Sequence, residues 1–179
     1  MSETTPTDQT TMDAEGRLFV LTGPGADDVA RALTAALPRA ASVDGAVVEA
    51  MFTGEGGVSP SDARTALETR YLRYTAGIAL ADSFRLAGFD AVVAEDVPDD
   101  HLEAYLDFAA PTPVHLVQLS VGEGGAGARD GEDGTAGDVA PAATPVPGLV
   151  LTGHDPVTLA AEIAARAEEA RVDPPVEGE

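Results

Sequence analysis

The sequence of 179 residues contains no cysteine, no tryptophan and no lysine, so all ten of its basic residues are arginine. Without cysteine, a disulfide framework, a thiol nucleophile and a cysteine metal site are excluded. Without lysine, the chain cannot form a Schiff base with a substrate, and it cannot supply the lysine of a phosphate-binding loop. No apolar run approaches the ~20 residues of a membrane span, and the first residues lack the pattern of a secretory signal. We therefore expect a cytoplasmic protein.

Basic residues are also scarce relative to the 31 acidic ones, which gives a formal net charge of −21. Nucleic acids and anionic membrane surfaces both bind through a basic face. The charge therefore argues against both as partners. It favours solubility but identifies no chemistry by itself. An unknown protein or a small molecule remains as the expected partner.

The length predicts one domain with a substantial core. Residues 1–15 and 172–179 are polar and lack periodicity, so we expect disordered tails on either side of a domain at 16–171. Within it, residues 121–147 are rich in Gly and Asp and contain no aromatic residue. Such a long insertion is typical of a disordered linker or of a lid over a site.

Short apolar runs alternate with helical patterns through the domain, which is typical of a parallel sheet covered by helices. The expected strands are 18–21, 41–43, 91–94, 114–119 and 149–152. Helices are expected from Gly25 to Pro38, from Ser59 to Gly88, over 99–108, and after Asp155-Pro156. The spacing predicts inward-facing positions on these helices at Val29, Leu33, Leu37, Leu67, Tyr71, Tyr74, Ile78, Phe84, Leu159 and Ile163. The fold class is thus α/β, with three layers and about five parallel strands.

The stretch from Arg17 to Leu37 has the layout of a phosphate-binding loop, because the turn Gly23-Pro24-Gly25 joins an apolar strand to a helix. The motif G-x-x-x-x-G-K-[ST] directs backbone N–H groups and a helix N-terminus at phosphates. Its lysine reaches the outer phosphates and its hydroxyl holds Mg²⁺. A plain turn between a strand and a helix is the alternative interpretation.

Over most of residues 17–171 the chain resembles the P-loop small-molecule kinases, in particular the shikimate-kinase-like and chloramphenicol-phosphotransferase-like group. The resemblance rests on the segments 18–26, 43–45, 87–96 and 114–119. It implies a P-loop NTPase fold, and for an active member it implies ATP and Mg²⁺ as cofactors. It also implies Asp44, Glu95 and Asp96 as candidate catalytic or metal-binding acids.

The sequence departs from the family where the chemistry should lie. Asp27-Asp28-Val29 stands where the family has Gly-Lys-Ser/Thr. Ala46 stands where the family has its second acid, and Glu49 stands where a basic residue often follows that acid. A helix N-terminus carries about +0.5 charge and attracts anions, but two carboxylates here occupy its first turn. A phosphate ~4 Å from one carboxylate meets roughly 4 kcal/mol of repulsion at an effective dielectric constant near 20.

We therefore interpret the loop as a vestigial nucleotide site, made of Gly23, Pro24, Gly25, Ala26, Asp27 and Asp28. The favoured hypothesis is a degenerate kinase-like protein, not an enzyme, that needs no cofactor and binds a ligand or a protein. One alternative is an atypical ATP-dependent phosphotransferase or NTPase. Another is a metal-assisted hydrolase that uses the three acids. The missing lysine separates the first hypothesis from the second.

The other polar residues fit structural roles. We expect Asp44 to form a turn before Gly45, and Glu95 with Asp96 to be a solvated strand end. His101, His115 and His154 lack the spacing of metal ligands, so no metal site is expected, and His115 fits a hydrogen-bonded position in a buried strand. Arg64, Arg70 and Arg73 are expected to pair with nearby acids.

Overall fold

The sheet is parallel, as the alternating pattern predicts. The computed structural model describes residues 15–53, 63–120 and 147–174. The strands β1 (Leu18–Thr22), β2 (Ala40–Asp44), β3 (Asp90–Ala94), β4 (Val114–Ser120) and β5 (Leu149–Thr152) lie in the order β2-β3-β1-β4-β5. Every neighbouring pair along this path is parallel. The predicted α/β class is therefore confirmed.

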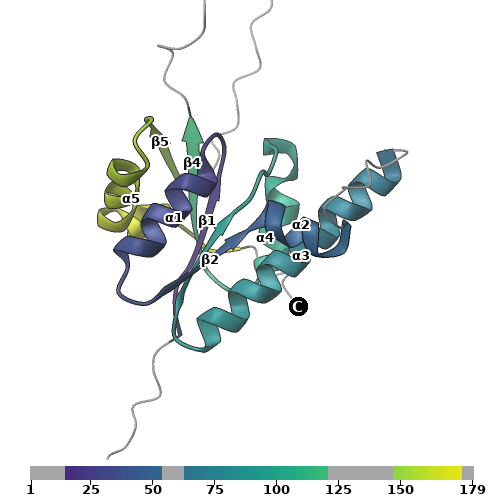
Figure 1. The fold of residues 1–179 in the computed structure, drawn as a ribbon, viewed down its shortest axis with the longest axis horizontal. Helices are drawn as coiled ribbons and strands as arrows, with labels where there is room; N and C mark the ends of the chain where they lie inside the picture. The colour runs from purple at the N-terminus through teal and green to yellow at the C-terminus, as the bar shows by residue number, and fades with distance from the viewer. Residues whose placement is uncertain (1–14, 54–62, 121–146, 175–179) are drawn as a thin grey trace, which may run out of the picture.

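Helices cover both faces of the sheet and complete the three layers (Figure 1). On one face lie α1 (Ala26–Ala36) and α5 (Pro156–Ala165), which contact each other. On the other face lie α2 (Gly45–Thr53), α3 (Ala63–Leu86) and α4 (Leu102–Ala109), the last preceded by a short 3-10 turn, η1 (Asp99–His101). The apolar side chains divide into two clusters, one on each side of the sheet.

Three elements were absent from the sequence prediction. Helix α2 starts directly after β2, where a turn was expected, because the Asp44 carboxylate accepts from Ala46 N at 2.8 Å and caps the new helix. Its sequence GAVVEAMFT is apolar almost all round, so it shows no helical period. At the other end of the domain, η2 (Ala167–Ala170) leads into β6 (Arg171–Val172), a strand of two residues that pairs antiparallel with β4.

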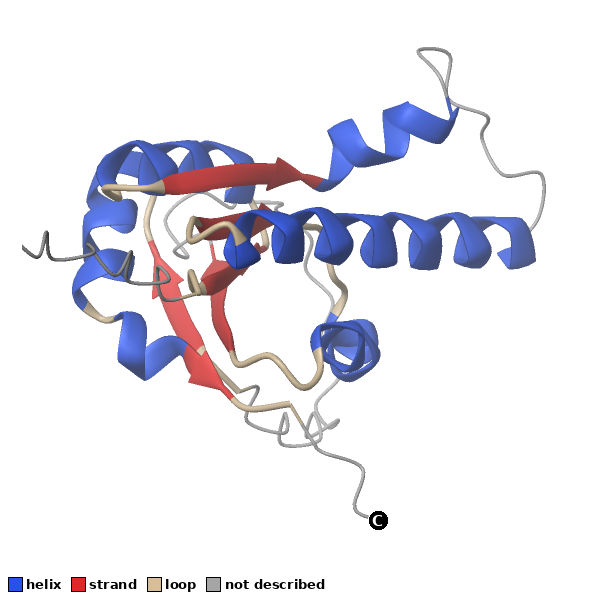
Figure 2. Cartoon of the chain, turned by 90° about the horizontal axis from the view of Figure 1, so that it is seen from below, coloured by secondary structure: helices blue, strands red, loops and turns tan. Residues whose placement is uncertain are grey.

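Helix α3 confirms part of its predicted inner face. Tyr74 and Ile78 are buried, but Leu67 and Phe84 are 39% and 38% exposed. The helix has 24 residues and is about 36 Å long, whereas a strand of five residues such as β3 is about 17 Å long. Its first turns therefore project past the sheet together with α2 (Figure 2). Phe84 lies six residues after Ile78 and so on a different side; Ala81 continues the buried face instead.

In α5 the prediction holds closely. The Asp155 carboxylate accepts from Thr158 N at 2.9 Å and caps the helix, whose Leu159 and Ile163 are buried. The expected start of the long helix at 59–62, the lid at 121–146 and most of both tails lie outside the described residues. Among the helices that the structure describes, none combines the length and the apolar character that crossing a bilayer requires.

Candidate functional site

A cleft opens at the carboxyl ends of β1, β2 and β3, the edge at which ligands bind in open α/β sheets. Its volume is about 410 Å³. It is lined by Gly23, Pro24, Gly25, Ala26, Asp27, Asp44, Ala46, Arg73, Ala94, Glu95 and Asp96. The structure thus brings the loop and the three candidate acids to one place, as the family resemblance implies. Of the six loop residues, 23–28, Asp28 lies outside the lining.

The loop itself is a tight turn of three residues between β1 and α1. The N–H of Ala26 donates to the carbonyl of Gly23 at 3.2 Å, and the helix begins there. Gly23 and Gly25 have φ of 100° and 76°, a region that favours glycine. A Cβ on Gly23 would lie 2.2 Å from the carbonyl oxygen of Leu119 in β4. The turn is therefore packed closely against the neighbouring strand.

Two carboxylates occupy the first turn of α1, as expected. Asp27 and Asp28 are exposed, with side-chain exposures of 53% and 60%. The Arg31 guanidinium, one turn further along, contacts Asp27 Oδ2 at 3.2 Å and also pairs with Asp28. The helix therefore supplies one cation of its own against two acids, and its N-terminus presents negative charge to the cleft.

Glu95 differs from the solvated strand end that the sequence predicts. Its side chain is only 2% exposed, and its Oε1 lies 2.7 Å from Nη2 of Arg73 and accepts from Asp96 N at 3.0 Å. Burial raises the pKa of the Glu95 carboxyl to about 7, although the guanidinium of Arg73 favours the charged form. The prediction is thus wrong for Glu95, whereas Asp96 is exposed as expected.

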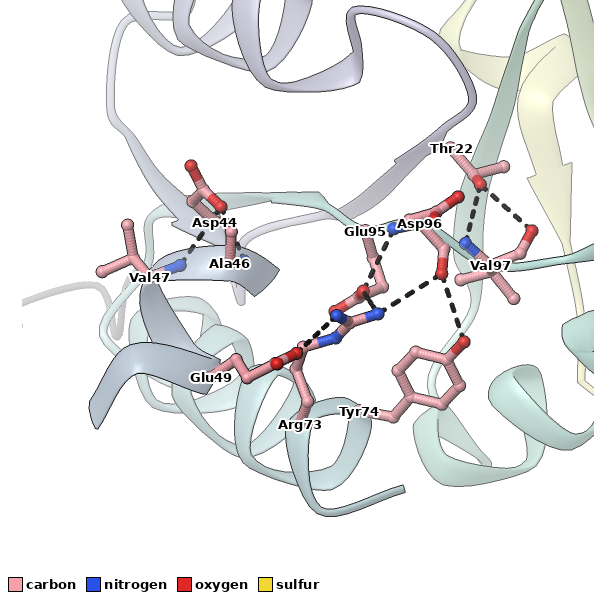
Figure 3. A network of polar contacts seen from close by, with 10 residues as sticks. All are labelled: Thr22, Asp44, Ala46, Val47, Glu49, Arg73, Tyr74, Glu95, Asp96 and Val97. Carbon is pink, nitrogen blue, oxygen red and sulfur yellow. Dashed lines mark hydrogen bonds and ion pairs between the residues drawn. The ribbon is translucent and has the colours of Figure 1, made fainter. Parts of the chain in front are cut away.

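Arg73 joins three elements around the floor of the cleft (Figure 3). From α3, its Nη1 lies 2.7 Å from Oε2 of Glu49 in α2, while Nη2 contacts Glu95 at the end of β3. These carboxylates together raise the pKa of the Arg73 guanidinium, against the effect of burial. Sequence reasoning grouped Arg73 with the surface arginines, since its partners lie 22 or more residues away in the chain.

The end of β2 lies close to the ion pair of Glu95 and Arg73. A Cβ on Gly45 would lie 2.2 Å from Oε2 of Glu95. Glycine is therefore required at the start of α2 for the helix to sit this close to the buried carboxylate. Asp44 beside it uses Oδ1 to accept from Ala46 N and, at 3.4 Å, from Val47 N.

Further hydrogen bonds fix the chain after β3. The hydroxyl of Tyr74 donates to the carbonyl of Asp96 at 3.2 Å. The Thr22 hydroxyl accepts from Val97 N at 3.1 Å and donates to its carbonyl at 3.3 Å. The hydroxyl of Tyr105, by contrast, is buried and has no hydrogen-bond partner among the described residues. The wall of the cleft that carries Glu95 and Asp96 is thus rigidly held.

The sequence predicts a structural role for His115 and no metal site. His115 is buried in β4, where Nδ1 lies 2.7 Å from the carbonyl of Ala167 and the ring stacks on Phe19 with centroids 4.8 Å apart. This confirms its expected role. Within residues 15–53, 63–120 and 147–174, no group of three or more His, Asp or Glu side chains is placed to hold a metal ion.

No family model and no curated protein matches this chain. Among solved structures, the chain is similar to the APS kinase CysC of Mycobacterium tuberculosis, determined as a cysteine-to-alanine mutant. The TM-score is 0.57 at 16% sequence identity, and the match covers 86% of this chain and 98% of that one. Because that protein is a P-loop kinase, the likeness confirms the predicted P-loop kinase-like fold. At this identity it shows the fold alone.

Proposed function

We propose that this chain is a P-loop kinase-like domain without phosphoryl-transfer activity, which acts by binding a ligand or a protein. The observation that carries the proposal is the closed turn Gly23–Gly25, followed at once by Asp27 and Asp28 in the helix. In a kinase of this fold, that position must hold the phosphates of the nucleotide.

The shape of the turn argues against a phosphate site. With the motif's Gly-Lys-Ser/Thr on Asp27-Asp28-Val29, four residues, 23–26, precede it, as in the motif. The spacing is therefore kept, but Pro24 has no N–H and Ala26 N already donates to Gly23 O. Two of these four positions thus offer no backbone N–H group to a phosphate.

The charges of the cleft argue in the same direction. Among the described residues that line it, Arg73 is the one cation, and it contacts both Glu95 and Glu49 at 2.7 Å. Val29, where the family has a hydroxyl for Mg²⁺, offers no oxygen. Mg²⁺ and ATP therefore do not fit the residues present, and we derive no reaction step through them.

The geometry also gives little support to a metal-assisted hydrolase. Asp44 is engaged as the cap of α2, and Glu95 is buried against Arg73, so Asp96 is the candidate acid with the freest carboxylate. A catalytic metal site typically has about three protein ligands and one coordination position left for water or substrate. A ligand that suits this cleft instead presents cationic or hydrogen-bond-donating groups to its carboxylates.

A thermal-shift experiment tests the proposal. A ligand at about 100 times its Kd adds about 2.7 kcal/mol to the stability of the folded state, which raises Tm by several degrees. We expect millimolar Mg²⁺·ATP, Mg²⁺·GTP and inorganic phosphate each to leave Tm unchanged. A saturable rise with either nucleotide, together with transfer or hydrolysis of its terminal phosphate, would contradict the proposal.

A double variant separates charge from turn geometry. Asp27→Asn with Asp28→Asn removes both carboxylates but leaves the short turn. If the turn also excludes phosphate, this variant still shows no nucleotide binding. Nucleotide binding by the variant alone would show that charge is the whole cause of the exclusion.

A further inference from the structure

Most of the exposed large apolar side chains belong to two helices. Of the eleven large apolar side chains that are exposed among the described residues, eight belong to α2 and α3. They are Val47, Met51, Phe52, Leu67, Leu72, Leu80, Phe84 and Leu86. Figure 2 shows α3 running across the front of the fold with no other described helix or strand over it. Two of these side chains, Leu72 and Leu86, share one side of α3, and uncovered apolar side chains that share a face mark a candidate interaction surface.

One row of side chains runs along the solvent side of α3, opposite its buried face. We call it the outer stripe, and it consists of Leu72, Thr75, Ala79, Ser83 and Leu86. Leu72 is 51% exposed and Leu86 is 67% exposed. Seven residues make about two helical turns, so Leu72, Ala79 and Leu86 share one side at intervals of about 10 Å.

The outer stripe is free of charge in a chain whose formal charge is −21. Between its two ends the helix carries only Arg73, Asp82 and Arg85 as charged residues. Arg73 turns toward Glu49 and Glu95, while Asp82 and Arg85 pair with each other at 3.4 Å. A second copy of this acidic chain can therefore approach here without bringing carboxylates together.

The polar atoms of the stripe are already satisfied within the helix. The Thr75 hydroxyl donates to the carbonyl of Tyr71 at 2.9 Å, and the Ser83 hydroxyl donates to that of Ala79 at 2.9 Å. Burying these hydroxyls against another surface leaves no donor without a partner. The stripe can thus be covered at little cost in desolvation.

The spacing of the stripe is symmetric about Ala79. If two copies of α3 lie antiparallel across a two-fold axis at Ala79, Leu72 of each lies opposite Leu86 of the other, and Thr75 lies opposite Ser83. The large residues then meet at both ends, and the small alanines let the helices approach at the centre. The chain outside the described residues is mostly polar, so it offers little to cover the stripe itself.

We propose that this protein forms a two-fold homodimer through the outer stripe of α3, with the two helices antiparallel. Because the two chains carry like charge, screening by salt strengthens the dimer, opposite to an interface that ion pairs hold together. This dimer is independent of what binds in the cleft.

Sedimentation equilibrium of the full chain tests the proposal. We expect a species of twice the 18.2 kDa chain mass whose dissociation constant falls as salt is raised. Ala79→Glu and Ala79→Arg should each weaken the dimer at least about tenfold, since either places two like charges on the axis. Ala161→Glu, at an exposed position of α5, is the matched control and should leave it intact. Circular dichroism verifies that each variant is folded.

Single-cysteine variants test the register, because the chain has no cysteine of its own. Under mild oxidation, Ala79→Cys should form a covalent dimer efficiently, and Ala161→Cys should not. Leu72→Cys should cross-link poorly with itself, since its two copies lie about 21 Å apart in this register, but well in a mixture with Leu86→Cys. A monomer at millimolar concentration, a dimer that Ala79→Glu leaves unchanged, or self-linking of Leu72→Cys would each overturn the proposal.

Discussion

Two pairs of adjacent acids belong to different walls of the same cleft, although Asp28 itself lies just outside its lining, and their environments differ. Asp27 and Asp28 lie in the first turn of α1, exposed, with Arg31 of their own helix as counter-ion. Glu95 and Asp96 end β3, and the Glu95 side chain is only 2% exposed, with Arg73 from another element as its counter-ion. A carboxylate is therefore a surface charge on one wall and a buried structural group on the other.

The difference shows what each wall does. At the N-terminus of a helix, exposed carboxylates stabilise the helix, and they repel any anion that approaches. At the end of the strand, a buried carboxylate is costly unless it is paired, and through Arg73 it ties β3 to α2 and α3. The exposed pair thus places negative charge at the cleft, and the buried Glu95 helps to hold the cleft in shape.

The largest difference in stability between the two walls is expected when the arginine that pairs with the acids of each wall is replaced. Arg73→Met leaves Glu95 buried without a counter-ion, which should lower the free energy of unfolding by about 3 kcal/mol or more at pH 8. The loss should shrink at pH 6, where Glu95 can take up a proton. Arg31→Met, the matched change on the other wall, should alter stability little, because Asp27 and Asp28 stay hydrated. Urea unfolding at both pH values measures the difference.

Equal losses from Arg73→Met and Arg31→Met would show that burial of Glu95 does not distinguish the two walls. A loss from Arg73→Met that is the same at pH 6 and pH 8 would place the effect in packing instead of charge.

The pH dependence of stability sharpens the same contrast. Burial raises the pKa of Glu95 from 4.5 to about 7 in the folded state, so between these values the folded chain binds more protons than the unfolded chain. Its contribution to stability is full below pH 4.5 and is lost as pH rises through 7, on the order of 3 kcal/mol in total. Glu95→Gln should therefore gain stability relative to the wild type from pH 5 to pH 8. Asp27→Asn, which changes an exposed carboxylate of α1, is the control variant.

The measurement is the difference in unfolding free energy between each variant and the wild type across that range. A difference for Glu95→Gln that stays flat with pH would mean that Glu95 titrates like a hydrated carboxyl.

A smaller effect is expected from filling the space beside Glu95. Gly45→Ala places a Cβ 2.2 Å from Oε2 of a carboxylate that Arg73 and Asp96 N hold in place, so the start of α2 must shift. We expect a loss of about 1–3 kcal/mol. Gly77→Ala is the control within α3, since its Cβ meets nothing within 4 Å, and it should gain up to about 1 kcal/mol from helix propensity. Thermal unfolding of the two variants compares them, and a neutral Gly45→Ala would show that Glu95 is free to move.

The smallest difference in stability is expected between variants of two tyrosines near Glu95. Tyr74→Phe loses the hydrogen bond to the carbonyl of Asp96 and should cost about 1 kcal/mol. Tyr105→Phe removes a buried hydroxyl that has no hydrogen-bond partner in the part of the chain that the structure describes, so it should be neutral or stabilising. Their difference in Tm is the measurement. Destabilisation by Tyr105→Phe would reveal a bond to its hydroxyl in solution.

The sheet and the location of the cleft could be predicted from the sequence because both follow from local patterns. Short apolar runs bounded by turns mark the strands, and parallel strands bring their carboxyl ends to one edge. Asp44, Glu95 and Asp96 therefore meet near Gly23–Gly25 for reasons that are visible along the chain.

The burial of Glu95 could not be predicted, because it depends on contacts between distant segments. Its partner Arg73 and the second acid Glu49 belong to two different helices. One of these, α2, is apolar almost all round and gives no periodic signal. The exposure of Leu67 likewise depends on how far α3 outruns the sheet, which spacing within the helix does not encode.

Calorimetric titration of Mg²⁺·ATP into the wild-type protein tests the central claim most directly, namely that the carboxylates and the short turn exclude nucleotide phosphates from the cleft. The account predicts no saturable heat up to millimolar nucleotide, with or without added salt. A one-to-one isotherm with a micromolar Kd, abolished by a Gly23→Val substitution in the turn, would contradict it.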